Sequence, residues 1–177
     1  MRDYEWLRQE PAPRHLVEAV KTLGEREAGG ERNNPTIVGW ALSLGGWVAR
    51  FYTQDSIPWC GLWMAYVLHR AERKHALKNP LRALDWAGYG VPAPRDPELS
   101  DILVFQRPGG GHVGLYVGED ATAFHVLGGN QGDRVSIVRI ARARLVAARR
   151  PSYQLKPNNI RRIHLAAASG RLSEDEA

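Results

Sequence analysis

The chain has 177 residues, 44% hydrophobic and 24% charged, a composition typical of one soluble globular domain with a sizeable core. Lys and Arg outnumber Asp and Glu by 24 to 19, and a net charge of +5 suits an anionic polymer or surface without selecting one. No nucleic-acid motif accompanies this charge, so we do not expect a nucleic-acid partner. The single cysteine excludes an intrachain disulfide and a multi-cysteine zinc site.

The first thirty residues carry acidic groups throughout and lack an apolar core segment, so they do not resemble a signal peptide. No apolar run approaches the length needed to span a bilayer. We therefore expect synthesis in the cytoplasm without a signal peptide, and no membrane insertion. A role outside the cytoplasm would then require another component for delivery.

The first half of the chain has helical periodicity. Apolar residues recur at helical spacing over 15–27, and a turn-rich loop at 28–35 leads to a second predicted helix that begins near Pro35 and closes near Gly45. Residues 79–90 read as a short amphipathic helix stopped by glycine. Residues 91–98 are a proline-rich connector, for which we expect no regular structure.

From Ser100 the apolar pattern changes to a period of two, which predicts strands. Short turns separate these segments and favour antiparallel neighbours. The predicted strands are 101–106, 112–118, 122–128 and 134–140, with 144–152 as a fifth at the sheet edge. We therefore expect an α+β fold, with N-terminal helices packed on an antiparallel sheet of about five strands.

Residues 57–71, IPWCGLWMAYVLHRA, hold the only cysteine, Cys60, in the first turn of a helix that is apolar nearly all round. Asp55 or Ser56 is placed to cap this helix. Backbone N–H groups and the helix dipole at such a position lower a thiol pKa and favour the thiolate. The pattern therefore makes Cys60 a candidate nucleophile, although a lone cysteine in an apolar helix is more often an inert core thiol.

His112 and Asn130 are the candidate partners of this thiol. His112 follows the glycine loop 109–111 and, by alternation, shares a face with Gly114 and Tyr116 rather than with the more apolar face of its strand. An imidazole there can take the thiol proton and return it to a leaving amine. Asn130 lies at a glycine-rich corner after the next strand, where its carbonyl oxygen can orient the imidazole.

The segments PWCGLWMAYVL, SDILVFQRPGGGHVGLYVGED and VLGGNQ occur in this order, and together they resemble the CHAP/NlpC-P60-like cysteine hydrolases, most closely a phage-associated subgroup. The resemblance implies a papain-like fold, with Cys60 as nucleophile, His112 as base and Asn130 as orienting residue. It covers roughly residues 16–151. We therefore expect one catalytic domain over 1–151 and a C-terminal extension over 152–177, for which a short amphipathic helix is possible.

The same resemblance implies hydrolysis of an amide bond in peptidoglycan, with peptidoglycan as the partner and no metal or organic cofactor. Both stem-peptide endopeptidase and N-acetylmuramoyl-L-alanine amidase activity fit it. An endolysin-like protein released with a holin, or a component of a phage-like particle, would reach the wall without a signal peptide. Ser100 and Gly61 depart from the residues usual in the family, where glycine and alanine respectively are common.

Several alternatives stay open. His125 competes with Asn130 for the third role, and Gln54 lies six residues before the cysteine, where papain-like enzymes place an oxyanion donor. Trp59 and Trp86 are candidates for a cleft wall or for the core. The remaining histidines are expected in solvent; they are His15, His69, His75 and His164.

Two other function classes also fit the chain. The first is a non-catalytic wall-binding or virion structural module on the same fold, for which loss of Cys60 or His112 would have argued. The second is a cysteine acyltransferase or deamidase, which shares the acyl-enzyme chemistry.

Overall fold

A computed structural model of the chain describes residues 2–93, 96–165 and 172–173. The helices, with η marking 3-10 helices, are η1 (Arg2–Arg8), α1 (Arg14–Lys21), α2 (Pro35–Leu44), α3 (Gly46–Phe51), α4 (Cys60–Arg70), η2 (Ala83–Gly88) and η3 (Arg142–Arg144). The strands are β1 (Val91–Pro92), β2 (Ile102–Arg107), β3 (Gly110–Glu119), β4 (Ala123–Gly128), β5 (Ser136–Ala141) and β6 (Leu145–Arg150).

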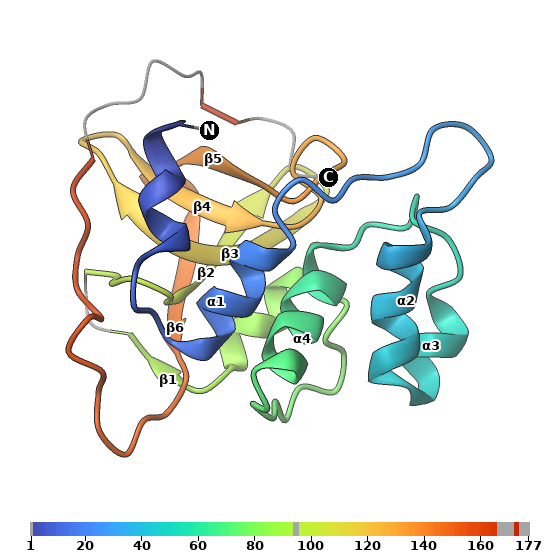
Figure 1. Ribbon diagram of the computed structural model, residues 1–177, viewed down its shortest axis with the longest axis horizontal. Helices are drawn as coiled ribbons and strands as arrows, with labels where there is room; N and C mark the ends of the chain where they lie inside the picture. Colours follow the sequence, from blue (N-terminus) through green and yellow to red (C-terminus); the bar gives the residue numbers. More distant parts are fainter. Residues whose placement is uncertain (1, 94–95, 166–171, 174–177) are drawn as a thin grey trace.

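In the described part of the chain the strands form one six-stranded antiparallel sheet, in the order β1-β6-β2-β3-β4-β5. Figure 1 shows α4 between this sheet and the α2–α3 pair, with α1 beside α4. The predicted α+β class, with N-terminal helices packed against an antiparallel sheet, is therefore confirmed.

Helix α4 is the centre of the main core because it is apolar on nearly every side. Eight of its eleven residues are buried, and they pack with α1, α2 and the helix-facing residues of the sheet. Val113, Leu115 and Val117 of β3 point into this core, as the alternation predicted. The opposite face of the sheet is also covered, and Tyr116 belongs to a second buried cluster there.

Helix α1 is shorter than the predicted 15–27 because the chain after Lys21 bonds to other elements. The Thr22 hydroxyl donates to the Ala19 carbonyl, which closes the helix. The Gly24 N–H then donates to the carbonyl of Val135, and Arg26 forms an isolated bridge with Arg134. Tertiary pairing with the segment before β5 thus replaces the last predicted helical turn.

Helix α3 was not predicted. Gly45 and Gly46 have φ of 69° and 58°, in the left-handed region that only glycine enters freely. The chain therefore turns at these residues and starts a new helix at once. The glycine pair ends one helix, as expected, but it also begins the next.

Three further expectations about regular structure were wrong. Val91 and Pro92 in the proline-rich connector form β1, which proline tolerates because this strand is at the sheet edge. Strand β6 consequently lies between β1 and β2 and not at the edge. The expected helix over 79–90 is a 3-10 helix at 83–88.

The C-terminal segment up to residue 165 is extended rather than helical. Its backbone bonds to the main body of the chain, with the Leu99 N–H donating to the Arg161 carbonyl and the Glu119 N–H to the Ile163 carbonyl. Ile160 is buried in the described structure. These external partners replace the internal hydrogen bonds of a helix.

Candidate active site

Cys60 is the first residue of α4 and lines a cavity of about 300 Å³. The residue is 6% exposed. The preceding residue, Trp59, supplies no side-chain cap; Asp55 does not cap the helix, and its carboxylate instead accepts from the N–H groups of Ala28 and Asn34. The first-turn N–H groups of α4 therefore receive no side-chain cap beside the thiol.

Gly61 stands where the hydrolases that the motifs resemble commonly have alanine, and its surroundings explain the difference. A Cβ placed on Gly61 would lie 2.5 Å from the Leu81 carbonyl oxygen and 2.6 Å from that of Pro80. The loop that carries these carbonyls also lines the cavity. Glycine after the cysteine thus allows the 80–81 backbone to pack directly on the start of α4.

The Cys60 thiol contacts the beginning of β3. Burial raises the pKa of Cys60, and this effect outweighs the backbone N–H groups of Val113 and Gly61 and the Arg107 guanidinium, which act in the opposite direction. The expectation of a lowered thiol pKa is therefore wrong, because desolvation exceeds the helix-end effect. The thiol is held beside the residue that follows His112, and it needs a base to become a thiolate.

His112 is fully buried, and its imidazole Nε2 lies 3.0 Å from the Oε1 of Gln131. The amide nitrogen of Gln131 fixes the orientation of this side chain. That nitrogen donates to the carbonyl of Ser136, at 2.6 Å, and to the carbonyl of Val126, at 3.3 Å. Oε1 is therefore an acceptor, which assigns the His112 proton to Nε2. In this tautomer Nδ1 carries the lone pair and is the nitrogen that can act as a base.

Asn130 does not make the contact expected of it. Its Oδ1 is buried without a hydrogen-bond partner among the described residues, and the His112 ring meets Gln131 instead. Asn130 lies beyond the end of β4 with φ of 57°, so strand alternation does not govern its side chain. Asparagine tolerates this left-handed conformation better than most residues, and the resulting turn directs Gln131 towards the imidazole.

Two glycines shape the surroundings of His112. A Cβ on Gly128 would lie 2.7 Å from Gln131 Oε1 and 3.0 Å from His112 Nε2, so the absent side chain makes room for their contact. At Gly114 the Val126 side chain fills the corresponding space, at 2.5 Å. Glycine at position 114 therefore lets the Val126 side chain pack directly on the β3 backbone.

The other candidates have different surroundings from those expected of them. His125 bonds to the Tyr4 hydroxyl and to Asp120 and does not approach Gln131 or His112 in the described contacts. Gln54 is exposed and lines a separate cavity of about 940 Å³. Trp59 and Trp86 are fully buried and belong to the core rather than to a cleft wall.

One of the four histidines expected in solvent is buried. His15 is fully enclosed, and its Nε2 lies 3.0 Å from the Ser100 carbonyl oxygen. Burial lowers the pKa of His15 to about 4. His69 and His164 are exposed, as predicted, while His75 is half-buried.

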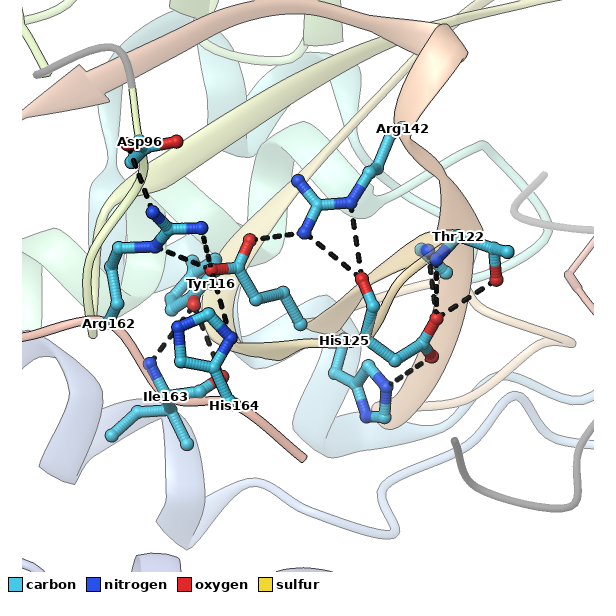
Figure 2. Close-up of polar contacts among 11 residues, drawn as sticks. Asp96, Tyr116, Thr122, His125, Arg142, Arg162, Ile163 and His164 are labelled. Carbon is cyan, nitrogen blue, oxygen red and sulfur yellow. Dashed lines mark hydrogen bonds and ion pairs between the residues drawn. The ribbon is translucent and has the colours of Figure 1, made fainter. Parts of the chain in front are cut away.

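A second buried polar cluster lies at the end of β3, where Glu119 and Asp120 are adjacent. Figure 2 shows Arg142 and Arg162 converging on the first carboxylate. Asp120 accepts from Arg139 at 2.7 Å and from His125 at 2.9 Å. Arg139, Arg142 and Arg162 thus pair with these two carboxylates and hold the β3–β4 turn.

Arginine pairing determines the ionisation of both carboxyl groups. Hydrogen bonding from Arg139 holds the pKa of Asp120 well below its usual range. Burial acts to raise the pKa of Glu119, but hydrogen bonds from Arg162 and Arg142 outweigh it and leave that pKa below its ordinary value. Both carboxylates stay ionised at neutral pH, which suits a structural cluster.

Within residues 2–93, 96–165 and 172–173, no group of three or more His, Cys, Asp or Glu side chains is arranged to hold a metal ion. In the same part of the chain, no helix is long and apolar enough to cross a membrane. Comparison of the whole chain with protein families, curated proteins and solved structures found no match. Function is therefore inferred from the contacts of Cys60, His112 and Gln131.

Proposed function

We propose that the protein is a cysteine amidohydrolase with a papain-like fold that cleaves an amide bond of peptidoglycan. One observation carries the proposal: the Cys60 thiol contacts the backbone beside His112, whose Nε2 is hydrogen-bonded to Gln131. In this proposal Cys60 is the nucleophile, His112 the base and Gln131 the orienting amide, beside the N-terminus of a buried helix. The motif resemblance supplies the substrate class.

In the proposed reaction, His112 Nδ1 takes the proton from the Cys60 thiol as sulfur attacks the amide carbonyl. The C–N bond then breaks, and the imidazolium donates the proton to the leaving amine. Water, activated by His112, next attacks the thioester, which releases the carboxylic acid and restores the thiol. Gln131 holds the ring with its proton on Nε2 through both steps.

The same site offers a place for the negative charge that develops on the carbonyl oxygen. Helix α4 begins at Cys60, and the first-turn N–H groups of a helix have no intrahelical acceptors. We assign the oxyanion to these backbone donors, because they lie at the positive end of the helix dipole and Cys60, where the helix begins, lines the cavity. Gln54, in the other cavity, has no part in this assignment.

Clearing of purified cell walls tests the proposal. Wild type is expected to solubilise the walls, and Cys60→Ser to lose at least about 1,000-fold in rate because the hydroxyl is a far weaker nucleophile at this site. Circular dichroism of the variant provides the folding control. Mass spectrometry of the new termini separates an endopeptidase from an N-acetylmuramoyl-L-alanine amidase.

Equal clearing by Cys60→Ser would overturn the proposed nucleophile. Absence of clearing by wild type on both Gram-negative and Gram-positive walls would overturn the proposed substrate. In that case release of ammonia or of a transferred acyl group from model amides would test the deamidase and acyltransferase alternatives.

A further inference from the structure

The cavity that Cys60 lines is positively charged. Two arginines, Arg82 and Arg107, line it, and no carboxylate does. The rest of its wall is apolar or backbone, including the glycine loop 109–111. A molecule that reaches the thiol through this cavity therefore passes two guanidinium groups.

The two arginines differ in how far their charge is already compensated. Arg82 pairs with Asp85 at 3.1 Å, and the Arg82 side chain is 66% exposed. Arg107 has only a long contact from its Nε to the Gly111 carbonyl, at 3.4 Å, and among the described residues no carboxylate pairs with it. Arg107 also acts on Cys60, as one of the charges that favour the thiolate. Arg107 is thus the cation with unused pairing capacity beside the nucleophile.

We propose that Arg107, assisted by Arg82, forms an anion subsite that selects substrates with a free carboxylate next to the scissile amide. This inference rests on the proposed function and adds to it a specificity for anionic over amidated peptides. A guanidinium binds a carboxylate through two parallel N–H donors, which fixes orientation as well as charge. The cavity volume of about 300 Å³ has room for such a group beside the reacting carbonyl.

Alkylation of the sole cysteine tests the subsite without any assumption about the natural substrate. Iodoacetate and iodoacetamide both form a carbon–sulfur bond and release iodide, but only iodoacetate carries a carboxylate. Because both reagents react with the same thiolate, the ratio of their rates cancels any change in the Cys60 pKa. The ratio for the urea-unfolded chain is the reference.

The folded wild type is expected to show a higher iodoacetate-to-iodoacetamide ratio than the unfolded chain. Arg107→Gln should lower this ratio by about threefold or more, the effect of one nearby charge partly screened by water. Arg82→Gln should lower it less, and Arg107→Lys should keep most of it. Arg50→Gln removes an exposed charge on α3, away from the cavity lining, and should leave it unchanged.

An unchanged ratio in the Arg82→Gln/Arg107→Gln double variant, with circular dichroism showing a folded chain, would overturn the subsite. A thiol that neither reagent labels in the folded protein would also overturn it, because the cavity would then not give access to Cys60. A ratio that falls as expected in a protein that clears no cell wall would keep the subsite and reject the proposed substrate.

Where wild type does clear cell walls, a matched pair of peptides completes the test. The two peptides differ only in a free or an amidated carboxyl next to the scissile bond. Arg107→Gln should raise KM for the free acid by about threefold or more and leave KM for the amide unchanged. Equal effects on both peptides would keep the hydrolase and reject the subsite.

Discussion

Two groups of buried titratable residues lie along β3. The first, called the corner here, joins Cys60 at the start of α4 to His112 near the start of β3, and the second is the Glu119–Asp120 cluster at the end of β3. At the cluster, each carboxylate meets at least one arginine, and the pKa of each is below its ordinary value. At the corner, burial raises the pKa of Cys60, and the guanidinium that acts on it, Arg107, has no carboxylate partner among the described residues.

This difference separates two uses of buried polarity. A compensated cluster fixes the turn between two strands, since removing any member exposes an unpaired charge. A site that leaves a thiol neutral and a cation unpaired is poised to gain from a ligand, because binding supplies the missing interactions. The two regions therefore predict opposite responses to mutation: loss of stability at the cluster, and loss of activity at the corner.

The largest expected effect is on stability. Arg139→Met leaves the buried Asp120 carboxylate without its principal partner, and we expect the free energy of unfolding to fall by about 3 kcal/mol. Urea denaturation measures it. Rates per folded molecule should not change, and Arg50→Met provides an exposed control. A loss below about 1 kcal/mol would show that His125 and Thr122 compensate Asp120 without arginine.

His15 sharpens the comparison because it is a buried base that pairs with no carboxylate in the part of the chain that the structure describes. Its pKa of about 4 in the folded state is below the 6.5 of an exposed histidine. Below pH 6.5 the unfolded chain binds a proton that the folded chain does not, so stability falls as pH drops towards 4, by about 3 kcal/mol. Unfolding of wild type and His15→Gln at pH 7 and pH 4 measures this.

The His15→Gln variant should show a flatter pH profile, because Gln cannot titrate but can still donate to the Ser100 carbonyl. His69→Gln, at an exposed site, should follow wild type. Parallel profiles for His15→Gln and wild type would contradict the burial of a neutral imidazole.

At the corner, Gln131→Leu should lower kcat by about 100-fold, because the His112 ring loses the acceptor that fixes its tautomer. Asn130→Gly retains the left-handed backbone and removes only the side chain, so we expect a change of less than about threefold. Steady-state hydrolysis of a soluble wall fragment measures both. If Asn130→Gly were as damaging as Gln131→Leu, the orienting role would return to Asn130.

The smallest expected loss of stability is at Gly61. Gly61→Ala forces the 80–81 backbone away from α4 and should cost about 2 kcal/mol in the free energy of unfolding. Gly39→Ala is the matched control, since a Cβ there meets nothing within 4 Å in the middle of helix α2. Thermal unfolding of the two variants should therefore shift in opposite directions, as alanine favours a helix. Equal shifts would indicate that the packing of Gly61 is loose.

Local patterns were sufficient for most of the fold. The all-round apolar run of α4 and the period of two after Ser100 reflect burial and pleating, which act within a few residues. Where partners came from distant segments, the sequence was a poorer guide. Residues 22–27 were expected to be helical, but their backbone bonds to the segment before β5. Residues 160–165 likewise bond to Leu99 and Glu119 instead of forming a helix.

The sequence by itself determined that one cysteine would begin a buried helix and that a histidine would lie near the start of an adjacent strand. Only the tertiary structure shows that the amide of Gln131, and not that of Asn130, contacts His112, because the turn at Asn130 sets the direction in which each side chain points. It also decided the sign of the Cys60 pKa shift. That sign depends on how much water the surrounding elements exclude, which no local pattern records.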